Sequence, residues 1–402
     1  MPDSSQQIAA RYYFPSNGPP QRDRLITFGR EVTAHAAAEE AENIALVPWL
    51  QNAHTHLELS GFEQPLGNPA HGFPAWIRDV IAWRRAQSGS PEELATARTA
   101  AIERGLCESL AAGVRTIHDI TSPLWQPSAY QLPGTVPLIY QELLGLSTAR
   151  ADEIFAVAEE ALNAPPEQRP AGLSPHAPYT IGIELLDRLA QLSAARRVPL
   201  AMHLAESLDE RELLSAHSGA FHTLLNDIGA WDPAALPRGI SILDYLQVLA
   251  KAHSALIVHG NYLHDDELDF IAENPQLAVV YCPRTHAYFG HARYPLVEML
   301  QRGIKVQIGT DSRASNPDLN IWNELRTIAD RYPELALDTI LALAFDPSLK
   351  LGEAGFLTPG NPASFLVISL PEEDTTDPYE LLLDARSVVR EAYWHGQRIA
   401  VS

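Results

Sequence analysis

The feature that most constrains the fold of this chain is a regular alternation of short apolar segments with longer amphipathic ones. The apolar segments have the composition of buried strands and lie at residues 45–50, 116–120, 137–142, 171–175, 199–204, 255–258, 278–282 and 305–309. Helical patterns lie between them, at residues 91–112, 149–163, 183–196, 240–252, 265–273 and 294–302. Because strands that alternate with helices form parallel sheets, these eight strands predict an α/β fold, a (β/α)8 barrel of the TIM type.

Three parts of the chain depart from this alternation. Short apolar runs separated by turn residues indicate further strands near both termini, at residues 25–28, 364–368 and 388–394. We therefore predict a small flanking composite β domain from residues 1–44 with 350–402, beside a barrel at residues 45–349. Residues 218–239 follow the fifth predicted strand with an interrupted pattern, and this segment is long enough to act as a lid over a site.

The charge balance narrows the possible partners. The chain has 29 basic and 50 acidic residues and a net charge of −21, whereas nucleic acids and anionic membranes are bound by clustered lysine and arginine. We therefore expect a small-molecule substrate, no nucleic acid and no membrane; a homo-oligomer is possible, without a recognisable interface signature. The two cysteines, Cys107 and Cys282, exclude a disulfide framework, and residues 1–11 lack an apolar targeting segment, so we expect a cytoplasmic protein.

Two histidines follow the first predicted strand at a spacing of two residues. Side chains two positions apart on a strand point to the same face, so His54 and His56 would project together from the end of this strand. The fifth predicted strand ends at His203, and Asp311 follows the eighth. Since barrel enzymes place their chemistry at the carboxyl ends of their strands, these three histidines and one aspartate predict a site for one divalent ion. This donor set suits zinc, with iron or manganese as alternatives.

Other polar side chains at the same strand ends have the chemistry that such an ion needs around it. A bound ion lowers the pKa of its water to about 7 and so provides hydroxide at neutral pH. Glu206, three residues after His203, could carry a proton from this water to a leaving group, and Asp311 could act as a base. His259, after the sixth strand, could hydrogen-bond the developing oxyanion, and His176, after the fourth, more plausibly touches substrate than metal.

In their order along the chain, these motifs resemble those of the amidohydrolase superfamily. The matching segments are residues 52–57, 174–179, 203–206, 258–260, 282–284 and 309–316, which together span most of the chain. Within the superfamily, the chain is most similar to the branch of cytosine deaminases, adenosine-analogue deaminases and triazine chlorohydrolases. The resemblance implies a barrel, a flanking β domain and one metal ion bound by His54, His56, His203 and Asp311, with Glu206 and His259 at catalytic positions. His176 matches a substrate-contacting position.

The same resemblance implies a metal-dependent deaminase of an aminopurine nucleoside or related heterocycle. One candidate substrate is aminodeoxyfutalosine, an adenine nucleoside that carries a benzoate. Arg284 or Arg313 could pair with its carboxylate, and the alternative for either arginine is a salt bridge at the surface. A chlorohydrolase or cyclic amide hydrolase remains open, because the same hydroxide would attack each of these substrates. A non-catalytic barrel scaffold is the second alternative, although it would have no need of both the metal ligands and Glu206.

Overall fold

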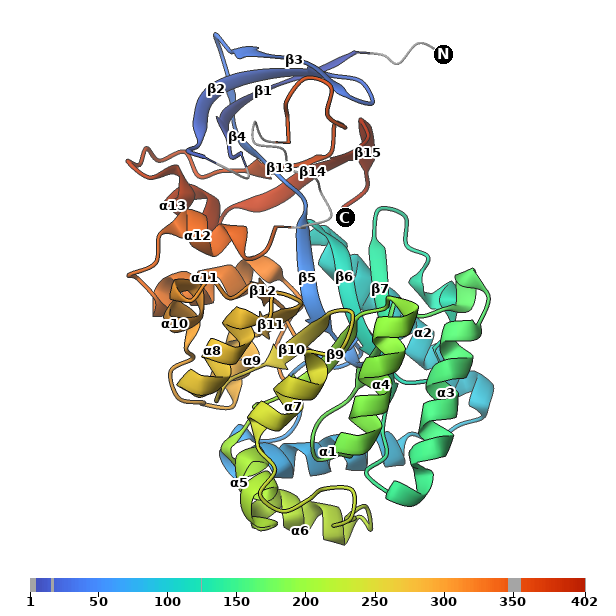
Figure 1. Ribbon diagram of the computed structural model, residues 1–402. Helices are drawn as coiled ribbons and strands as arrows, with labels where there is room; N and C mark the ends of the chain where they lie inside the picture. Colours follow the sequence, from blue (N-terminus) through green and yellow to red (C-terminus); the bar gives the residue numbers. More distant parts are fainter. Residues whose placement is uncertain (1–4, 16–17, 124, 346–355, 402) are drawn as a thin grey trace.

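The computed structural model describes residues 5–15, 18–123, 125–345 and 356–401. These residues form two β-sheets, one of eight strands and one of seven, that lie one above the other (Figure 1). The eight-stranded sheet curls into a barrel, with helices on its outer side. The seven-stranded sheet, here called the terminal sheet, combines strands from both ends of the chain. This architecture confirms the predicted TIM-type barrel with a flanking β unit.

All strands of the barrel are parallel and follow one another in chain order. They are β5 (Leu50–Thr55), β6 (Val114–Thr121), β7 (Val136–Leu143), β8 (Gly172–Pro175), β9 (Leu200–Leu204), β10 (Ala255–His259), β11 (Leu277–Tyr281) and β12 (Val306–Ile308). Their carboxyl ends point away from the terminal sheet (Figure 1). Seven of the eight predicted strands overlap these ranges along most of their length, because most of them have the near-continuous apolar sequence of a strand buried on both faces.

The first predicted barrel strand is wrong. Residues 45–47 belong to β4 (Glu42–Val47) of the terminal sheet, and the barrel begins only at Leu50. Pro48 separates the two strands, since proline has no N–H to donate to a ladder. Trp49 is fully buried between the two sheets and donates a hydrogen bond from Nε1 to the carbonyl of Tyr393 at 2.8 Å. The unbroken apolar run therefore contains the point at which the chain passes from the terminal sheet to the barrel.

The helices fall into two groups. Those beside the barrel strands are α2 (Pro91–Ala111), α3 (Ala151–Asn163), α4 (Ile183–Arg196), α7 (Ile242–Leu249), α8 (Asp265–Glu273), α10 (Leu296–Gln301) and α11 (Ile321–Arg331). At the carboxyl ends of the strands lie α1 (Phe73–Ala86), α5 (Leu208–Ala216) and α6 (Gly219–Asp227), as Figure 1 shows. Shorter helices are α9 (Pro283–Tyr288), α12 (Leu337–Ala342) and α13 (Pro378–Leu383). The predicted start of α2 is present, with a capping box between Ser90 and Glu93.

The terminal sheet joins both ends of the chain through one central strand. Besides β4 it contains β1 (Gln6–Tyr13), β2 (Gln21–Phe28), β3 (Val32–Ala37), β13 (Phe365–Ser369), β14 (Val388–Trp394) and β15 (Gln397–Ile399). Strand β4 pairs in parallel with β1 and antiparallel with β13. The predicted domain boundary after residue 44 therefore falls inside β4, and the boundary after residue 349 lies outside the described residues. The division into domains stays a prediction.

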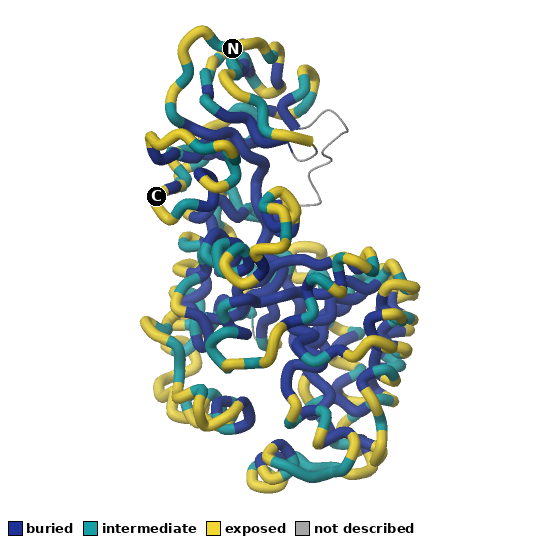
Figure 2. Tube along the Cα trace, turned by 90° about the vertical axis from the view of Figure 1, so that its left-hand side faces the viewer, coloured by how far each residue is buried: buried dark blue, intermediate teal, exposed yellow. Residues whose placement is uncertain are grey.

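Burial is concentrated in the barrel and in the terminal sheet, as the dark segments of Figure 2 show. The barrel interior is filled by side chains such as Ile120, Tyr140, Val258 and Val280, so it is a packed core. Both cysteines are free thiols, Cys107 exposed and Cys282 buried. In the described ranges, no helix combines the length and the apolar character that crossing a lipid bilayer requires.

Candidate active site

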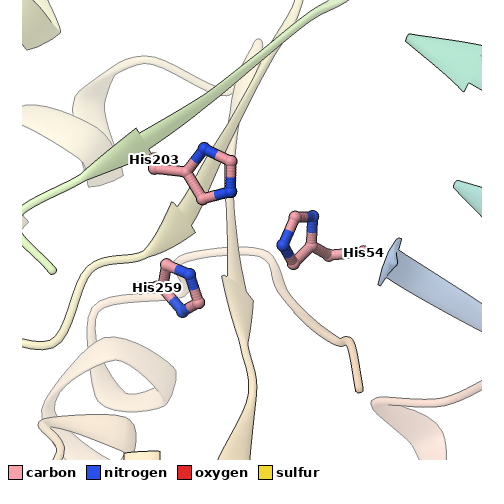
Figure 3. A group of neighbouring side chains, drawn as sticks. All are labelled: His54, His203 and His259. Carbon is pink, nitrogen blue, oxygen red and sulfur yellow. The ribbon is translucent and has the colours of Figure 1, made fainter. Parts of the chain in front are cut away.

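Histidines from three strands converge at the carboxyl end of the barrel. His54 comes from β5, His203 from β9 and His259 from the last position of β10, and their rings face one another (Figure 3). The ring centroids lie 5.0 Å apart for His54 and His203, and 5.6 Å apart for His54 and His259. All three side chains are buried. The barrel topology thus brings together residues that are far apart in the sequence.

The remaining predicted metal ligands join this cluster. Asp311 Oδ1 lies 3.3 Å from Nε2 of His54 and 3.9 Å from Nε2 of His56. Nε2 of His56 in turn lies 3.3 Å from Nε2 of His203. Donor atoms within reach of one ion occur in two overlapping groups, His54 with His56 and Asp311, and His54 with His203 and His259. The four residues predicted as ligands are therefore brought together, with His259 as a fifth nitrogen donor beside them.

The chemical state of these side chains fits a divalent cation. Nε2 of His54 is buried and has no hydrogen-bond partner, which is costly for a polar atom unless a ligand occupies that position. Burial holds the pKa of His54 and of His56 well below the usual range, and neighbouring imidazoles add to this effect. Burial also lowers the pKa of His203 to about 4. Neutral imidazoles are the form that binds metal ions, so the cluster is ready to accept one.

Hydrogen bonds behind the cluster fix the direction of two ligands. Nδ1 of His203 lies 3.0 Å from the carbonyl oxygen of His176, which leaves Nε2 to face the site. Oδ2 of Asp311 accepts a hydrogen bond of 2.6 Å from the hydroxyl of Ser315, so Oδ1 is the oxygen turned towards the histidines. The Ser315 hydroxyl is itself 3.0 Å from Oγ1 of Thr285. Such partners hold ligands in place before an ion arrives.

The barrel closes at the seam between β5 and β12, next to the ligands. The Asn52 side chain donates to Oγ1 of Thr310 at 2.7 Å and accepts from the Thr310 amide at 3.1 Å. The amide of Asp311 donates to the carbonyl of His54 at 3.1 Å. A Cβ on Gly309 would meet Cβ of His54 at 2.8 Å, so only glycine allows this close approach. The seam thus aligns two of the predicted ligands directly.

A buried carboxylate that the sequence did not reveal supports the His54–Leu57 segment from the side. Asp119, in β6, accepts hydrogen bonds at Oδ1 from the amide of Leu57 at 2.7 Å and from the hydroxyl of Thr55 at 3.0 Å. Its Oδ2 accepts one from the hydroxyl of Tyr130 at 2.6 Å. Burial nevertheless raises the pKa of Asp119 to about 7. In the sequence this residue looks like any polar residue in a strand.

Glu206 and His259 form a pair at the base of the site. Nε2 of His259 lies 3.3 Å from Oε1 of Glu206, and both side chains are buried. Burial, and then the carboxylates of Asp311 and Glu210, raise the pKa of Glu206 well above its usual range. The Glu210 carboxylate accepts hydrogen bonds from the amides of Ala205 and Glu206, each at 2.9 Å, and so fixes the turn that carries Glu206.

Backbone strain marks the same strand ends. Ala205, His259 and Asp311 have φ angles of +53°, +71° and +56°, in the left-handed region that favours glycine. Each residue stands at or just beyond the end of a barrel strand. Non-glycine residues keep such a conformation only where the surroundings fix it, and these positions cluster at functional sites. Here the strained backbone turns the chain at the strand ends, next to the side chains that form the site.

A cavity of about 360 Å³ opens above the cluster. His56, His176, His203, Glu206, His259 and Asp311 lie among its polar lining residues. Its walls are mostly apolar, and α1 contributes Phe73, Trp76, Ile77, Val80 and Ile81 along one face of the helix. Two arginines, Arg84 and Arg150, also line it. An apolar cavity with a few convergent polar groups is typical of a small-molecule site.

The two arginines predicted to bind substrate form salt bridges. Arg313 donates two hydrogen bonds of 2.9 Å from Nη1 to the carboxylate of Glu108, and one of 2.7 Å from Nε to the carbonyl of Phe62. Arg284 pairs with Asp318 at 2.5 Å. Neither side chain lines the cavity. Both arginines therefore form salt bridges, which was the alternative to substrate binding. Their partners, from distant parts of the chain, hold the guanidinium groups outside the cavity lining.

The segment predicted to be a lid borders the cavity. It contains α6, and its residues Leu224, Leu225, Ile228 and Ala230 line the apolar wall. The segment was expected to be irregular, but its first part is helical because its apolar residues share one face of α6. Whether it opens and closes stays a prediction.

Comparisons with known proteins agree with this geometry. The model of the amidohydrolase family matches residues 44–390. The aminodeoxyfutalosine deaminase of Deinococcus radiodurans is 30% identical over 320 residues, which are 74% of this chain and 71% of that protein. The 5-methylthioadenosine/S-adenosylhomocysteine deaminase of Moorella thermoacetica is 27% identical over 359 residues, 85% of this chain and 77% of the relative.

A solved structure shows the same fold over nearly the whole chain. The aminofutalosine deaminase of Helicobacter pylori, in complex with methylthio-coformycin, superposes with a TM-score of 0.80 at 21% identity, covering 98% of this chain and 100% of that one. The family predicted from the strand-end motifs is thereby confirmed. The chain belongs to the amidohydrolase family.

Proposed function

We propose that this chain is a metal-dependent deaminase that replaces the amino group of an aminopurine nucleoside by oxygen and releases ammonia. One observation carries the proposal: a cluster of possible metal ligands and the Glu206–His259 pair lie together at the base of one cavity. The relatives described above that are named as nucleoside deaminases support this choice of substrate. Water is the co-substrate, and the carbon–nitrogen bond to the amino group is the bond that breaks.

The proposed ion is held by His54, His56, His203 and Asp311. Three imidazole nitrogens and one carboxylate oxygen suit zinc better than the oxygen-preferring magnesium or calcium. When bound, such an ion supplies Lewis acidity and an activated water. The buried and unpartnered Nε2 of His54 and the fixed orientation of His203 and Asp311 support this assignment.

The proton transfers are assigned to Glu206. Its carboxyl group lines the cavity next to the ligand cluster, so it can take a proton from the attacking water and pass it to a ring nitrogen of the base. It can then carry the proton of the added hydroxyl to the amino group, which leaves as ammonia. His259 lies 3.3 Å from Glu206 and can donate a hydrogen bond to the oxygen that adds to the ring. His176 lines the cavity beside them and is proposed to contact the base.

The wall of the cavity supports a nucleoside with an apolar substituent that ends in an anion. On α1, Ile77, Val80, Ile81 and Arg84 follow one another at helical spacing, so an apolar strip ends in a guanidinium group. Aminodeoxyfutalosine has this character. Arg84 also pairs with Glu58 at 2.8 Å, but unlike Arg284 and Arg313 it lines the cavity, so we assign it as the partner of the substrate carboxylate.

Ammonia release by the zinc-loaded protein tests the proposal. The substrates are aminodeoxyfutalosine, 5′-methylthioadenosine, S-adenosylhomocysteine, adenosine, cytosine and a chlorotriazine. We expect ammonia from at least one nucleoside, and in Glu206→Gln a loss of turnover of about 100-fold to 10,000-fold with an unchanged zinc content. Glu160→Gln, an exposed carboxylate of α3 outside the cavity lining, is the matched control and should keep full activity.

Two results would contradict the proposal. Chloride release without ammonia would make the protein a chlorohydrolase. Full turnover in a zinc-loaded Glu206→Gln variant would show that Glu206 does not carry out the proton transfers.

A further inference from the structure

One carboxylate in the cavity has no role in the proposed chemistry. Glu142 lies near the carboxyl end of β7 and is 4% exposed. It lies two residues after Tyr140, whose side chain fills the barrel interior, so both point to the same side of the strand. Because β7 ends at Leu143, the Glu142 side chain enters the cavity that lies above the interior, and it is one of the cavity's lining residues.

No described residue donates a hydrogen bond to this carboxylate. The nearest basic group is Nε2 of His176, at 3.9 Å from Oε1, which is beyond hydrogen-bond distance. Burial raises the pKa of Glu142, and the positive charge of Arg84 opposes the rise. Buried polar groups are almost always hydrogen-bonded, and a buried carboxylate without donors is costly. Since the group faces the cavity, the donors that satisfy it can come from a bound ligand.

The surroundings favour hydroxyl donors over a cationic group. Arg84 lines the same cavity and is close enough for its charge to affect both Glu142 and His176. A ligand ammonium group would therefore be repelled by this guanidinium group, which also pairs with Glu58 at 2.8 Å, and by the ion of the proposed metal site. Neutral hydroxyl groups meet no such repulsion. Two adjacent hydroxyls also match the two oxygens of one carboxylate, each accepting one hydrogen bond.

The position of Glu142 matches the part of a nucleoside next to the base. The ring of His176 lies 4.9 Å, between centroids, from the ring of His203 in the ligand cluster. Oε1 of Glu142 lies 3.9 Å from Nε2 of the same histidine, so Glu142 is a cavity neighbour of His176. A base whose reacting carbon is at the cluster would lie along His176, and its sugar would then extend towards Glu142.

We propose that Glu142 selects the ribose of the substrate by accepting hydrogen bonds from its 2′ and 3′ hydroxyl groups. This inference rests on the proposed nucleoside deaminase function. It makes Glu142 a specificity-determining residue that contacts the substrate away from the bond that breaks. Loss of the contact should therefore weaken binding and change KM more than kcat.

The test compares 5′-methylthioadenosine with its 2′-deoxy and 3′-deoxy analogues. In the wild-type protein we expect each missing hydroxyl to lower kcat/KM by about 10-fold to 100-fold, because it removes a hydrogen bond to a charged group. In Glu142→Gln, KM for the ribonucleoside should rise by a similar factor at nearly constant kcat, and the preference for ribose should largely disappear. Glu160→Gln, at an exposed position of α3, is the control and should keep the wild-type preference.

The outcomes separate this inference from the proposed function. Failure of the zinc-loaded wild-type protein to release ammonia from any nucleoside would refute the function itself. Deamination with equal kcat/KM for the ribo and deoxy substrates would refute only the role of Glu142, and this wild-type measurement decides even if Glu142→Gln does not fold. A Glu142→Gln defect confined to S-adenosylhomocysteine, which carries an ammonium group, would overturn the hydroxyl assignment in favour of a cation site.

Discussion

Replacement of Asp119 by alanine should loosen the metal site without touching a ligand. The Asp119 carboxylate accepts hydrogen bonds from the Leu57 amide, the Thr55 hydroxyl and the Tyr130 hydroxyl. In Asp119→Ala, Thr55 keeps the carbonyl of His118 as an acceptor at 3.0 Å. The Leu57 amide and the Tyr130 hydroxyl lose theirs, at a cost of about 1–3 kcal/mol for each buried donor. Since Leu57 follows His56, the segment that carries two ligands loses its lateral support.

The expected result is a zinc affinity about 10-fold to 100-fold below that of the wild-type protein, the usual effect of removing a group behind the ligands. Asp119→Asn is the matched variant. Its amide oxygen can take the place of Oδ1, and its NH2 can donate to the Tyr130 hydroxyl, so the zinc affinity should change less than in Asp119→Ala. Competition with a chelator of known affinity measures the dissociation constant, and thermal unfolding of the metal-free proteins measures the loss of stability. Wild-type zinc affinity in Asp119→Ala would refute the reasoning.

Two further predictions concern charged groups around the site. In steady-state assays, Arg84→Met should raise KM for a carboxylate-bearing nucleoside by about 10-fold to 100-fold and leave KM for 5′-methylthioadenosine nearly unchanged. Arg313→Met is the comparison and should change neither KM value. Equal effects of the two variants would contradict the assignment of Arg84. Burial raises the pKa of Glu324 from 4.5 to about 8, so the folded state keeps a proton that the unfolded state has already lost. The free energy of unfolding should therefore fall as the pH rises through this window, and urea unfolding of Glu324→Gln should show a smaller decrease; equal slopes would contradict the shift.

The residues that cluster at the candidate site could be predicted from the sequence because two regularities combine. Buried parallel strands are near-continuous apolar runs, and barrel enzymes use the residues that follow them, so His203, His259 and Asp311 stand out at the ends of such runs. The boundary between β4 and β5 could not be predicted in the same way. Both strands are largely buried, and only Pro48 and Trp49 separate them, so composition alone does not show that the chain changes sheets there.

The supporting and substrate-binding residues were harder to identify. Asp119 and Glu142 lie inside strands, where a polar residue has no signature beyond its departure from the apolar pattern. Helix α1 begins after Gly72 without a side-chain cap, which removes the usual signal for a helix start and left Arg84 unnoticed. The partner of Arg313, Glu108, is 205 residues away in the sequence, and such a contact is visible only in the folded chain.

The seam between β5 and β12 has a consequence for how the barrel is held shut. Asn52 and Thr310, which meet there, are 258 residues apart in the sequence, and His54 and Asp311 flank them on the same two segments. A single ion bound to His54 and Asp311 would cross-link the first and last strands of the barrel, in the way that a disulfide joins the ends of a long loop. Zinc would then stabilise the closed barrel as well as take part in catalysis. When zinc is lost, β5 and β12 should separate before any other pair of neighbouring strands.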